Sequence, residues 1–356
     1  MNYMQVRLTW GSAILFLFPV LLSAQPVGYY QPAFDLAGPA LHQALHDIID
    51  QHATYPYTSS QTDVWDILKV TDRDPNNPSQ VLLLYCGESV DADQEWNNGK
   101  GWSREHVWAK SRGNFGNTEG PGTDVHHLRP ADPSINSTRN NRAFDACIAC
   151  NPVLFNNVAT GSFSDGQSWT FEPRNAIKGD IARMIFYMAV RYESSDGIDL
   201  ALTDSVLGQT DKQPLHGKKA TLLAWHQQDP VDSREQYRND VIEQQFQGNR
   251  NPFIDYPELA DHLWGARQQE SWSPLATSGP PVPVPHVSLH PNPAKSWLRI
   301  HLPGAQSAQV LDAMGRVCQS LVLQDGGTVV DIQSLPAGQY HLQFSDGSTH
   351  SFTKLP

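Results

Sequence analysis

The chain has 356 residues, of which 39% are hydrophobic, and a formal net charge of −12 at pH 7. An ordinary domain has roughly 100–200 residues, so this length predicts two folded units with enough apolar residues for a core. The acidic total excludes a tight architectural binder of polyanions, because such binding needs a strongly basic surface.

The N-terminus has the pattern of a secretory signal peptide. Arg7 supplies a positive charge, an apolar stretch runs from Ala13 to Leu22, and Leu22-Ser23-Ala24 is a small-residue cleavage site. The alternative, a membrane anchor, would need about twenty apolar residues, and this stretch is shorter. We therefore expect removal of residues 1–24, export, and no membrane span in the mature chain.

Four segments are predicted to be helical because their apolar residues recur every three or four positions. The second carries a stripe of methionine and isoleucine, which fits core packing better than a partner surface. The apolar run 81–85 is expected to be a buried strand, and residues 113–122 a polar, glycine-rich loop. The helical segments are about residues 39–49, 176–192, 220–227 and 232–247.

A Ser- and Pro-rich segment, residues 273–285, is predicted to be a stiff, extended linker. After it, apolar residues alternate with polar ones in the runs 298–302 and 340–344, and turn-forming glycines separate such runs. We therefore expect residues 286–356 to form a small all-β sandwich without a catalytic cluster.

The four cysteines are Cys86, Cys147, Cys150 and Cys318. Cys147 and Cys150 could form a redox pair or half of a zinc site, but no second Cys/His pair with zinc spacing lies nearby. A structural bridge in the first unit, or simply buried thiols, is the favoured interpretation, and export makes a disulfide possible.

The charge is unevenly distributed along the chain. From residue 280 onward four cations balance four anions, so the negative charge belongs to the main unit. Within residues 100–142, however, seven Lys and Arg residues face four Asp and Glu residues. Chance can scatter charges in this way, but a locally basic groove on an acidic body fits an enzyme that must bind and then release a polyanion.

Three motifs lie close together in this basic region. They are Trp-Ser-Arg-Glu-His-Val-Trp at 102–108, Thr-Asp-Val-His-His-Leu-Arg-Pro at 123–130, and Ser-Ile-Asn-Ser-Thr-Arg-Asn-Asn at 134–141. Together they offer a carboxylate, a carboxamide, imidazoles and guanidinium groups. Such a set suits metal-assisted cleavage of a phosphodiester, in which oxygen ligands hold a hard cation, a neutral His accepts a proton and Arg neutralises phosphate.

Three residues receive specific roles from this chemistry. Glu105 and the carbonyl oxygen of Asn136 are candidate ligands of Mg²⁺, with Mn²⁺ or Ca²⁺ as alternatives. His106 is the candidate general base, because its unperturbed pKa suits proton removal at neutral pH. Adjacent strand residues face opposite sides, so Glu105 and His106 can share a site only at an irregular backbone or a strand end. Asn136 should then lie on a short helix facing that strand.

Each of these residues also has a simpler interpretation by itself. A lone Glu-His pair is usually a surface salt bridge, and Asn140-Asn141 fits turn chemistry alone. Adjacent His126 and His127 could suggest a transition metal, but on a strand their side chains diverge. His126, with Asp124, is therefore expected to support the site from behind it. The ordered combination of motifs, rather than any one residue, favours catalysis.

At these residues the chain resembles the bacterial endonuclease I family, which are secreted or periplasmic nucleases with a His-Me finger (ββα-metal) active site. The matches are Arg-Glu-His-Val at 104–107, Asp-Val-His-His-Leu at 124–128 with Pro130, and Ile-Asn-Ser-Thr-Arg-Asn-Asn at 135–141. Residues 181–188 resemble the family's long core helix, and residues 225–231 and 247–253 its C-terminal signature. The resemblance extends from about residue 40 to 265.

The resemblance implies that His106 is the general base and that Glu105 and Asn136 hold Mg²⁺. It also implies an arginine that binds phosphate, in the loop between the base and the helix. The candidates for that arginine are Arg112, Arg129, Arg139 and Arg142.

The tail resembles a type IX secretion sorting domain. The matching segments are 290–294, 312–316, 335–340 and 352–354. The resemblance implies a contact with the type IX secretion machinery and then release or attachment at the cell surface. A β-sandwich binding module is the alternative.

We therefore predict an α+β protein with a mainly helical nuclease domain around a ββα-metal core and an all-β tail. The expected domains are a signal peptide (1–24), a nuclease domain (25–272), a linker (273–285) and a sorting domain (286–356). The predicted function is Mg²⁺-dependent cleavage of DNA, and also of RNA, without strong sequence specificity, leaving 5′-phosphate ends. The alternatives are a catalytically inactive nucleic-acid-binding surface protein and a phosphodiesterase of small substrates.

Overall fold

The chain divides into two compact units, one up to Leu275 and one from Ala276. The computed structural model describes residues 25–26, 28–147, 150–274, 288–290, 294–301, 306–312, 315–324, 328–345 and 349–356. The predicted signal peptide and most of the predicted linker lie outside these residues.

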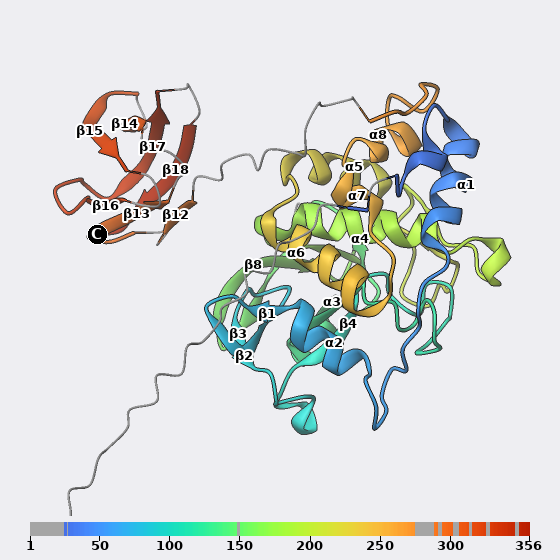
Figure 1. Ribbon diagram of the computed structural model, residues 1–356. Coiled ribbons are helices and arrows are strands. Elements are labelled where there is room, and N and C mark those ends of the chain that lie inside the picture. Colours follow the sequence, from blue (N-terminus) through green and yellow to red (C-terminus); the bar gives the residue numbers. More distant parts are fainter. Residues whose placement is uncertain are drawn as a thin grey trace, which may run out of the picture. The chain divides into compact units, whose positions relative to one another are not determined.

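The first unit is built around one buried helix, α4, which runs through its middle (Figure 1). All fourteen residues of α4 are buried, including charged ones such as Arg183, whose guanidinium pairs with Glu235 at 2.6 Å. The helices of this unit are α1 (Gly38–Ile49), α2 (Val64–Thr71), α3 (Pro133–Arg139), α4 (Lys178–Arg191), α5 (Lys219–Gln228), α6 (Ser233–Val241), α7 (Pro252–Asp255) and α8 (Leu259–Trp264).

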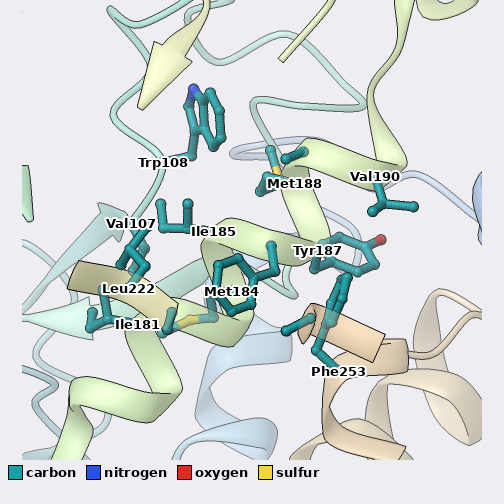
Figure 2. Close-up of a cluster of buried hydrophobic side chains, with 14 of the residues drawn as sticks. Val107, Trp108, Ile181, Met184, Ile185, Tyr187, Met188, Val190, Leu222 and Phe253 are labelled. Carbon is teal, nitrogen blue, oxygen red and sulfur yellow. The ribbon is translucent and has the colours of Figure 1, made fainter. Parts of the chain in front are cut away.

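The helical predictions are confirmed to within a few residues, and the apolar residues of α1, α4 and α5 pack in one core. The last of them, 232–247, is α6 followed by a π-helical turn, Ile242–Phe246. Met184 and Met188 of α4 are buried in the main cluster, so the methionine stripe is a core surface (Figure 2). Val107 and Trp108, which directly follow His106, belong to the same cluster and are fully buried. The core thus anchors the chain just after the candidate base.

The predicted strand at 81–85 is only partly correct. The strand β2 ends at Leu82, and residues 83–86 turn, although Leu83, Leu84 and Tyr85 are buried. The N–H of Gly87, which has a φ of +74°, donates to the carbonyl of Leu83 and closes this turn. A run of apolar residues indicates burial, but it does not by itself distinguish a buried turn from a buried strand.

The strands of the first unit form small sheets around the helical core. The pair β4 and β5 is antiparallel, with Glu105 opposite Arg129 and His106 opposite Leu128. The strands are β1 (Arg73–Asp74), β2 (Asn77–Leu82), β3 (Ser89–Asp91), β4 (Ser103–His106), β5 (Leu128–Ala131), β6 (Ala143–Phe144), β7 (Asn151–Phe155), β8 (Val158–Asp165), β9 (Thr170–Glu172), β10 (Ala201–Leu202) and β11 (Leu215–His216).

The second unit is all-β, as predicted. Its strands form a three-stranded sheet, in the order β12-β13-β16, and a four-stranded sheet, in the order β15-β14-β17-β18. Alternate residues of both sheets, such as Leu298 and Ile300 of β13 and Leu342 of β17, share one core. The strands are β12 (Ser288–His290), β13 (Trp297–His301), β14 (Gln306–Asp312), β15 (Val317–Leu323), β16 (Thr328–Asp331), β17 (Gly338–Phe344) and β18 (Thr349–Lys354).

Cys147 and Cys150 form a disulfide within the first unit. This is the structural bridge that the sequence favoured over a zinc half-site. Cys86, which is partly buried, and Cys318, which is exposed, have free thiols.

Replacing Ile185 with alanine is expected to lower the free energy of unfolding by about 2–5 kcal/mol, because the side chain is fully buried in the main core and its loss leaves a cavity. Val206, which is 37% exposed in a loop, provides the control: Val206→Ala should change that free energy by less than about 0.5 kcal/mol. Urea unfolding measures both, and equal effects would contradict the assignment of Ile185 to the core.

Candidate active site

The segment that carries the three motifs folds into β4, a long loop, β5 and α3. Helix α3 begins directly after β5 because Asp132 caps it, accepting hydrogen bonds from the amides of Ser134 and Ile135, and Pro133 occupies the first turn. The buried side chain of Ile135 packs in the main core. These local signals set α3 against β4.

Glu105, His106 and Asn136 line one cavity of about 330 Å³. His106 is the last residue of β4, so the strict alternation of a strand no longer separates it from Glu105. Asn136 faces the strand, since its Nδ2 donates to Ser103 Oγ at 3.2 Å and to the Arg104 carbonyl at 3.4 Å. The structure therefore brings together the three residues to which the sequence assigned the chemistry. The cavity is lined by Arg104, Glu105, His106, Ala109, Lys110, Ser111, Asn136, Ser137, Asn140 and Asn141.

One hydrogen bond determines the tautomer of His106. Its Nε2 lies 2.9 Å from the carbonyl oxygen of Gly122, and a carbonyl only accepts, so Nε2 carries the proton. The other nitrogen, Nδ1, is then the basic one. Burial, and secondarily the neighbouring His127, keeps the pKa of His106 well below its usual range. The imidazole is consequently neutral at pH 7, as a proton acceptor must be.

The loop between β4 and β5 holds this carbonyl in place. A Cβ added to Gly122 would lie 2.6 Å from the carbonyl oxygen of Thr118, so only glycine permits this close approach. The ring of Tyr57 stacks on His106, with centroids 5.6 Å apart and planes 20° apart. The imidazole is therefore fixed both at its edge and on its face.

Asp124 and His126 lie behind this loop in a buried polar network rather than at the cavity. The Asp124 carboxylate accepts hydrogen bonds from Tyr187 Oη at 2.8 Å and Tyr192 Oη at 2.9 Å, while His126 Nε2 lies 3.2 Å from the Asn249 carbonyl. Burial alone raises the pKa of Asp124, but its histidine neighbours and hydrogen bonds hold that pKa well below the usual range. The network ties the loop that carries Gly122 to α4 and to the 247–251 segment.

Glu105 is buried, and only one of its two carboxylate oxygens contacts polar groups of other residues. Tyr85 Oη donates to Oε1 at 2.6 Å, and Arg139 Nη1 lies 3.1 Å from the same oxygen. Burial raises the pKa of Glu105, although Arg139 and Tyr85 oppose that rise. Within the described residues, neither Glu105 Oε2 nor Asn136 Oδ1 accepts a hydrogen bond, so the cavity contains two uncommitted oxygen donors.

The four arginines proposed as phosphate ligands do not line the cavity. Arg112 and Arg139 are turned into the protein. The guanidinium of Arg112 donates to four backbone carbonyls, and that of Arg139 donates to the carbonyls of His106 and Val107. Through these bonds Arg112 and Arg139 hold the loops around the site together.

Arg129 is buried as well, and its Nε donates to Asp72 at 2.6 Å. Arg142 alone of the four is partly exposed, and its guanidinium lies 3.9 Å from the ring centre of Trp169. The sequence identified an excess of cations here, but sequence spacing carried no information about which of them point inward.

The cations that do line the cavity are Arg104 and Lys110, which the sequence did not single out. Arg104 stacks on Tyr57, with its guanidinium carbon 3.4 Å from the ring centre, and donates to the Tyr57 carbonyl. Lys110 is exposed, and its Nζ lies 2.8 Å from Asn117 Oδ1. The sequence signals were the excess of cations in residues 100–142 and, for Arg104 alone, its place in the motif Arg-Glu-His-Val.

The stability of the fold is expected to fall in mild acid because several histidines are buried in neutral form. Burial lowers the pKa of His126, His127 and His226 from 6.5 to about 4. Between these values the unfolded chain binds more protons than the folded one, so the stabilisation is complete above pH 6.5 and is lost toward pH 4. The loss is about 1.4 kcal/mol per pH unit for each histidine. Urea unfolding at about pH 7, 6 and 5 measures it, and equal free energies at the three values would contradict it.

The site thus combines a neutral imidazole with one free nitrogen, two free oxygen donors and two cations, a composition suited to an enzyme that hydrolyses phosphodiesters. A family model described as Endonuclease I matches residues 37–258, and another, described as Secretion system C-terminal sorting domain, matches residues 288–355. The chain belongs to the endonuclease I family and carries a C-terminal sorting domain, which confirms both resemblances seen in the sequence.

Two curated relatives agree with this assignment. Over 255 residues the chain is 48% identical to an extracellular ribonuclease of Bacillus subtilis (strain 168), a match that covers 71% of this chain and 84% of the relative. Over 243 residues it is 50% identical to an extracellular ribonuclease of Bacillus amyloliquefaciens, covering 68% and 80%. The protein is therefore a nuclease that is secreted or attached to the cell surface. None of the helices among the described residues has the length and apolar character needed to cross a membrane.

Proposed function

We propose that this nuclease is a metal-dependent endonuclease of RNA and DNA, without strong sequence specificity, that leaves 5′-phosphate ends. The observation that carries the proposal is the convergence of Glu105, His106 and Asn136 on one cavity, with Nδ1 of His106 free to accept a proton. The unit β4, β5 and α3 is then the proposed ββα-metal core.

The residues present fit a hard divalent cation. Glu105 Oε2 and Asn136 Oδ1 are a carboxylate and an amide oxygen, the donors that Mg²⁺ prefers, and two protein ligands leave room for several waters. No group of three or more His, Cys, Asp or Glu residues that could hold a metal exists among the described residues, which disfavours a zinc-type site there. We propose Mg²⁺ as the ion, with Mn²⁺ or Ca²⁺ as alternatives.

In the proposed reaction, His106 Nδ1 takes a proton from water as the water oxygen attacks phosphorus. The bond from phosphorus to the 3′ oxygen breaks, the 3′ oxygen gains a proton from solvent, and the products carry a 3′ hydroxyl and a 5′ phosphate. The bound cation would supply charge stabilisation for the phosphate and the leaving oxygen. The bond from His106 Nε2 to Gly122 stabilises the tautomer in which Nδ1 is basic.

The proposed phosphate contacts are Lys110 and Arg104, because both line the cavity. Lys110 is exposed and can turn its ammonium toward a phosphate, while Arg104 is held by Tyr57 and contributes mainly a fixed positive charge. Asp124 and His126 are proposed to act indirectly, by holding the loop that presents the Gly122 carbonyl.

RNA is included as a substrate because the relatives are extracellular ribonucleases. A catalytically inactive surface protein is disfavoured, since the base and both oxygen ligands are present and assembled. A phosphodiesterase of small substrates is less favoured, because the cavity is open to solvent on a cationic rim rather than closed around a small ligand.

The test is digestion of supercoiled plasmid and of single-stranded RNA by the mature chain, with Mg²⁺ and with EDTA. We expect internal cleavage of both substrates, and this cleavage should stop in EDTA. The products should carry 5′ phosphates, which a phosphatase must remove before a kinase can label the 5′ ends. Binding of nucleic acid without cleavage would favour the catalytically inactive surface protein. Cleavage of small phosphodiesters alone would favour the phosphodiesterase of small substrates.

A further inference from the structure

An aromatic side chain and a cation lie beside the proposed site without a role in the chemistry above. Trp169 is in the turn between β8 and β9, and it is only partly buried. The guanidinium of Arg142 lies 3.9 Å from the centre of its ring. The indole Nε1 donates to Asn141 Oδ1 at 2.8 Å, and Asn141 lines the cavity. Trp169 is thus one residue away from the cavity wall.

The backbone at Trp169 is unusual for such a bulky residue. Its φ of +57° is in the left-handed region, which disfavours an L-residue with a Cβ by about 1–2 kcal/mol and is normally occupied by Gly or Asn. A turn of this kind does not require tryptophan. Strained residues of this type cluster at binding sites, where the side chain has a use that offsets the strain.

Arg142 is held in place but has a free donor. Its Nε donates to the Asp165 carbonyl at 3.3 Å, and its Nη1 donates to the Thr138 carbonyl at the end of α3. Its Nη2 donates no hydrogen bond within the described part of the chain. A cation fixed on an aromatic ring, with one open N–H group beside a phosphodiester site, can pair with a phosphate while the planar groups stack on a base.

We propose that Trp169 and Arg142 form a subsite for an unpaired nucleotide next to the scissile phosphate, and that this subsite makes the enzyme prefer single-stranded over duplex nucleic acid. The proposal rests on the proposed nuclease function and names its substrate class. In a duplex the faces of each base are covered by neighbouring bases, so only an unpaired base can stack on a side chain. Stacking depends little on base identity, which agrees with cleavage without sequence specificity.

The test compares one end-labelled oligonucleotide, single-stranded and annealed to its complement, as substrates of the mature chain. Trp169→Ala is expected to raise KM for the single strand about 10-fold while changing kcat and the duplex KM little, because a stacked base contributes about 1–3 kcal/mol. Trp169→Phe keeps a ring but loses the N–H group that binds Asn141, so it should retain most of the affinity. Arg142→Gln should also raise KM for the single strand, and it provides a second variant if Trp169→Ala does not fold.

Three results would overturn the subsite. They are a wild-type enzyme without preference for the single strand, an equal rise in KM for both substrates, and a Trp169→Phe variant as impaired as Trp169→Ala. The last result would mean that the rise in KM comes from losing the hydrogen bond between Trp169 Nε1 and Asn141, and not from losing a stacked base. Fluorescence anisotropy of the same oligonucleotides in EDTA measures binding without cleavage, and it tests whether the affinities of the wild type and the variants follow the expected order. Binding that follows the expected ranking in a protein that cleaves neither substrate would refute the proposed function but support the subsite.

Discussion

Replacing His106 with alanine is expected to lower kcat by about 10²–10⁴-fold, because general-base catalysis by a positioned imidazole contributes an effect of this size. Binding of an oligonucleotide should be nearly unchanged, since the side chain makes no proposed contact with phosphate. Turnover of plasmid in Mg²⁺, together with anisotropy of a labelled oligonucleotide, measures the two effects separately.

His42 provides the control for that experiment. It lies on α1, pairs with Glu193 at 2.7 Å and lines a different cavity, so His42→Ala should leave turnover unchanged. Added imidazole should restore part of the activity of His106→Ala, which a purely structural role would not allow. Unchanged turnover in a folded His106→Ala variant would remove His106 from the mechanism.

Replacing Asn136 with alanine is expected to shift the Mg²⁺ concentration required for half-maximal activity upward by about 10-fold or more. The substitution removes one of two proposed protein ligands, and changes around metal sites typically have effects of about 10–100-fold. Titration of activity with Mg²⁺ measures the shift, and calorimetry with Mn²⁺ measures binding without turnover.

The neighbouring residue supplies a matched control. Ser137 also lines the cavity, but its hydroxyl donates to the Pro133 carbonyl at 2.8 Å, so Ser137→Ala should leave the titration unaltered. Asn136→Asp restores an oxygen and adds negative charge, and it should bind the ion more tightly than Asn136→Ala. An unaltered metal titration for Asn136→Ala would refute its role as a ligand.

Much of the fold could be predicted from the sequence, because the local signals agreed with the packing. The helical spacing of the methionine stripe predicted α4, and the twofold period of the tail predicted its sheets. The cap at Asp132 and the proline after it place α3 where Asn136 was expected. The predicted strand at 81–85 failed in part, because burial of an apolar run leaves its backbone conformation open.

The candidate site was predicted unevenly. Residue type and order sufficed to group Glu105, His106 and Asn136, since their chemistry is specific and they lie close in the chain. The same reasoning could not choose among the arginines. Whether a guanidinium pairs with a backbone carbonyl or faces solvent depends on loops such as 207–211, which lie far from Arg112 in sequence.

The sequence by itself determined the family and the sorting domain, and it supplied the candidates for the base and the oxygen ligands, because contiguous motifs carry all of these. Only the tertiary structure decided how they act together. The carbonyl of Gly122 selects the tautomer of His106, and a buried network behind that loop keeps the carbonyl in place. Folding also turned Arg112, Arg129 and Arg139 inward and brought Trp169 against Asn141 of the cavity wall, because long-range contacts, and not local order along the chain, decide where a side chain points.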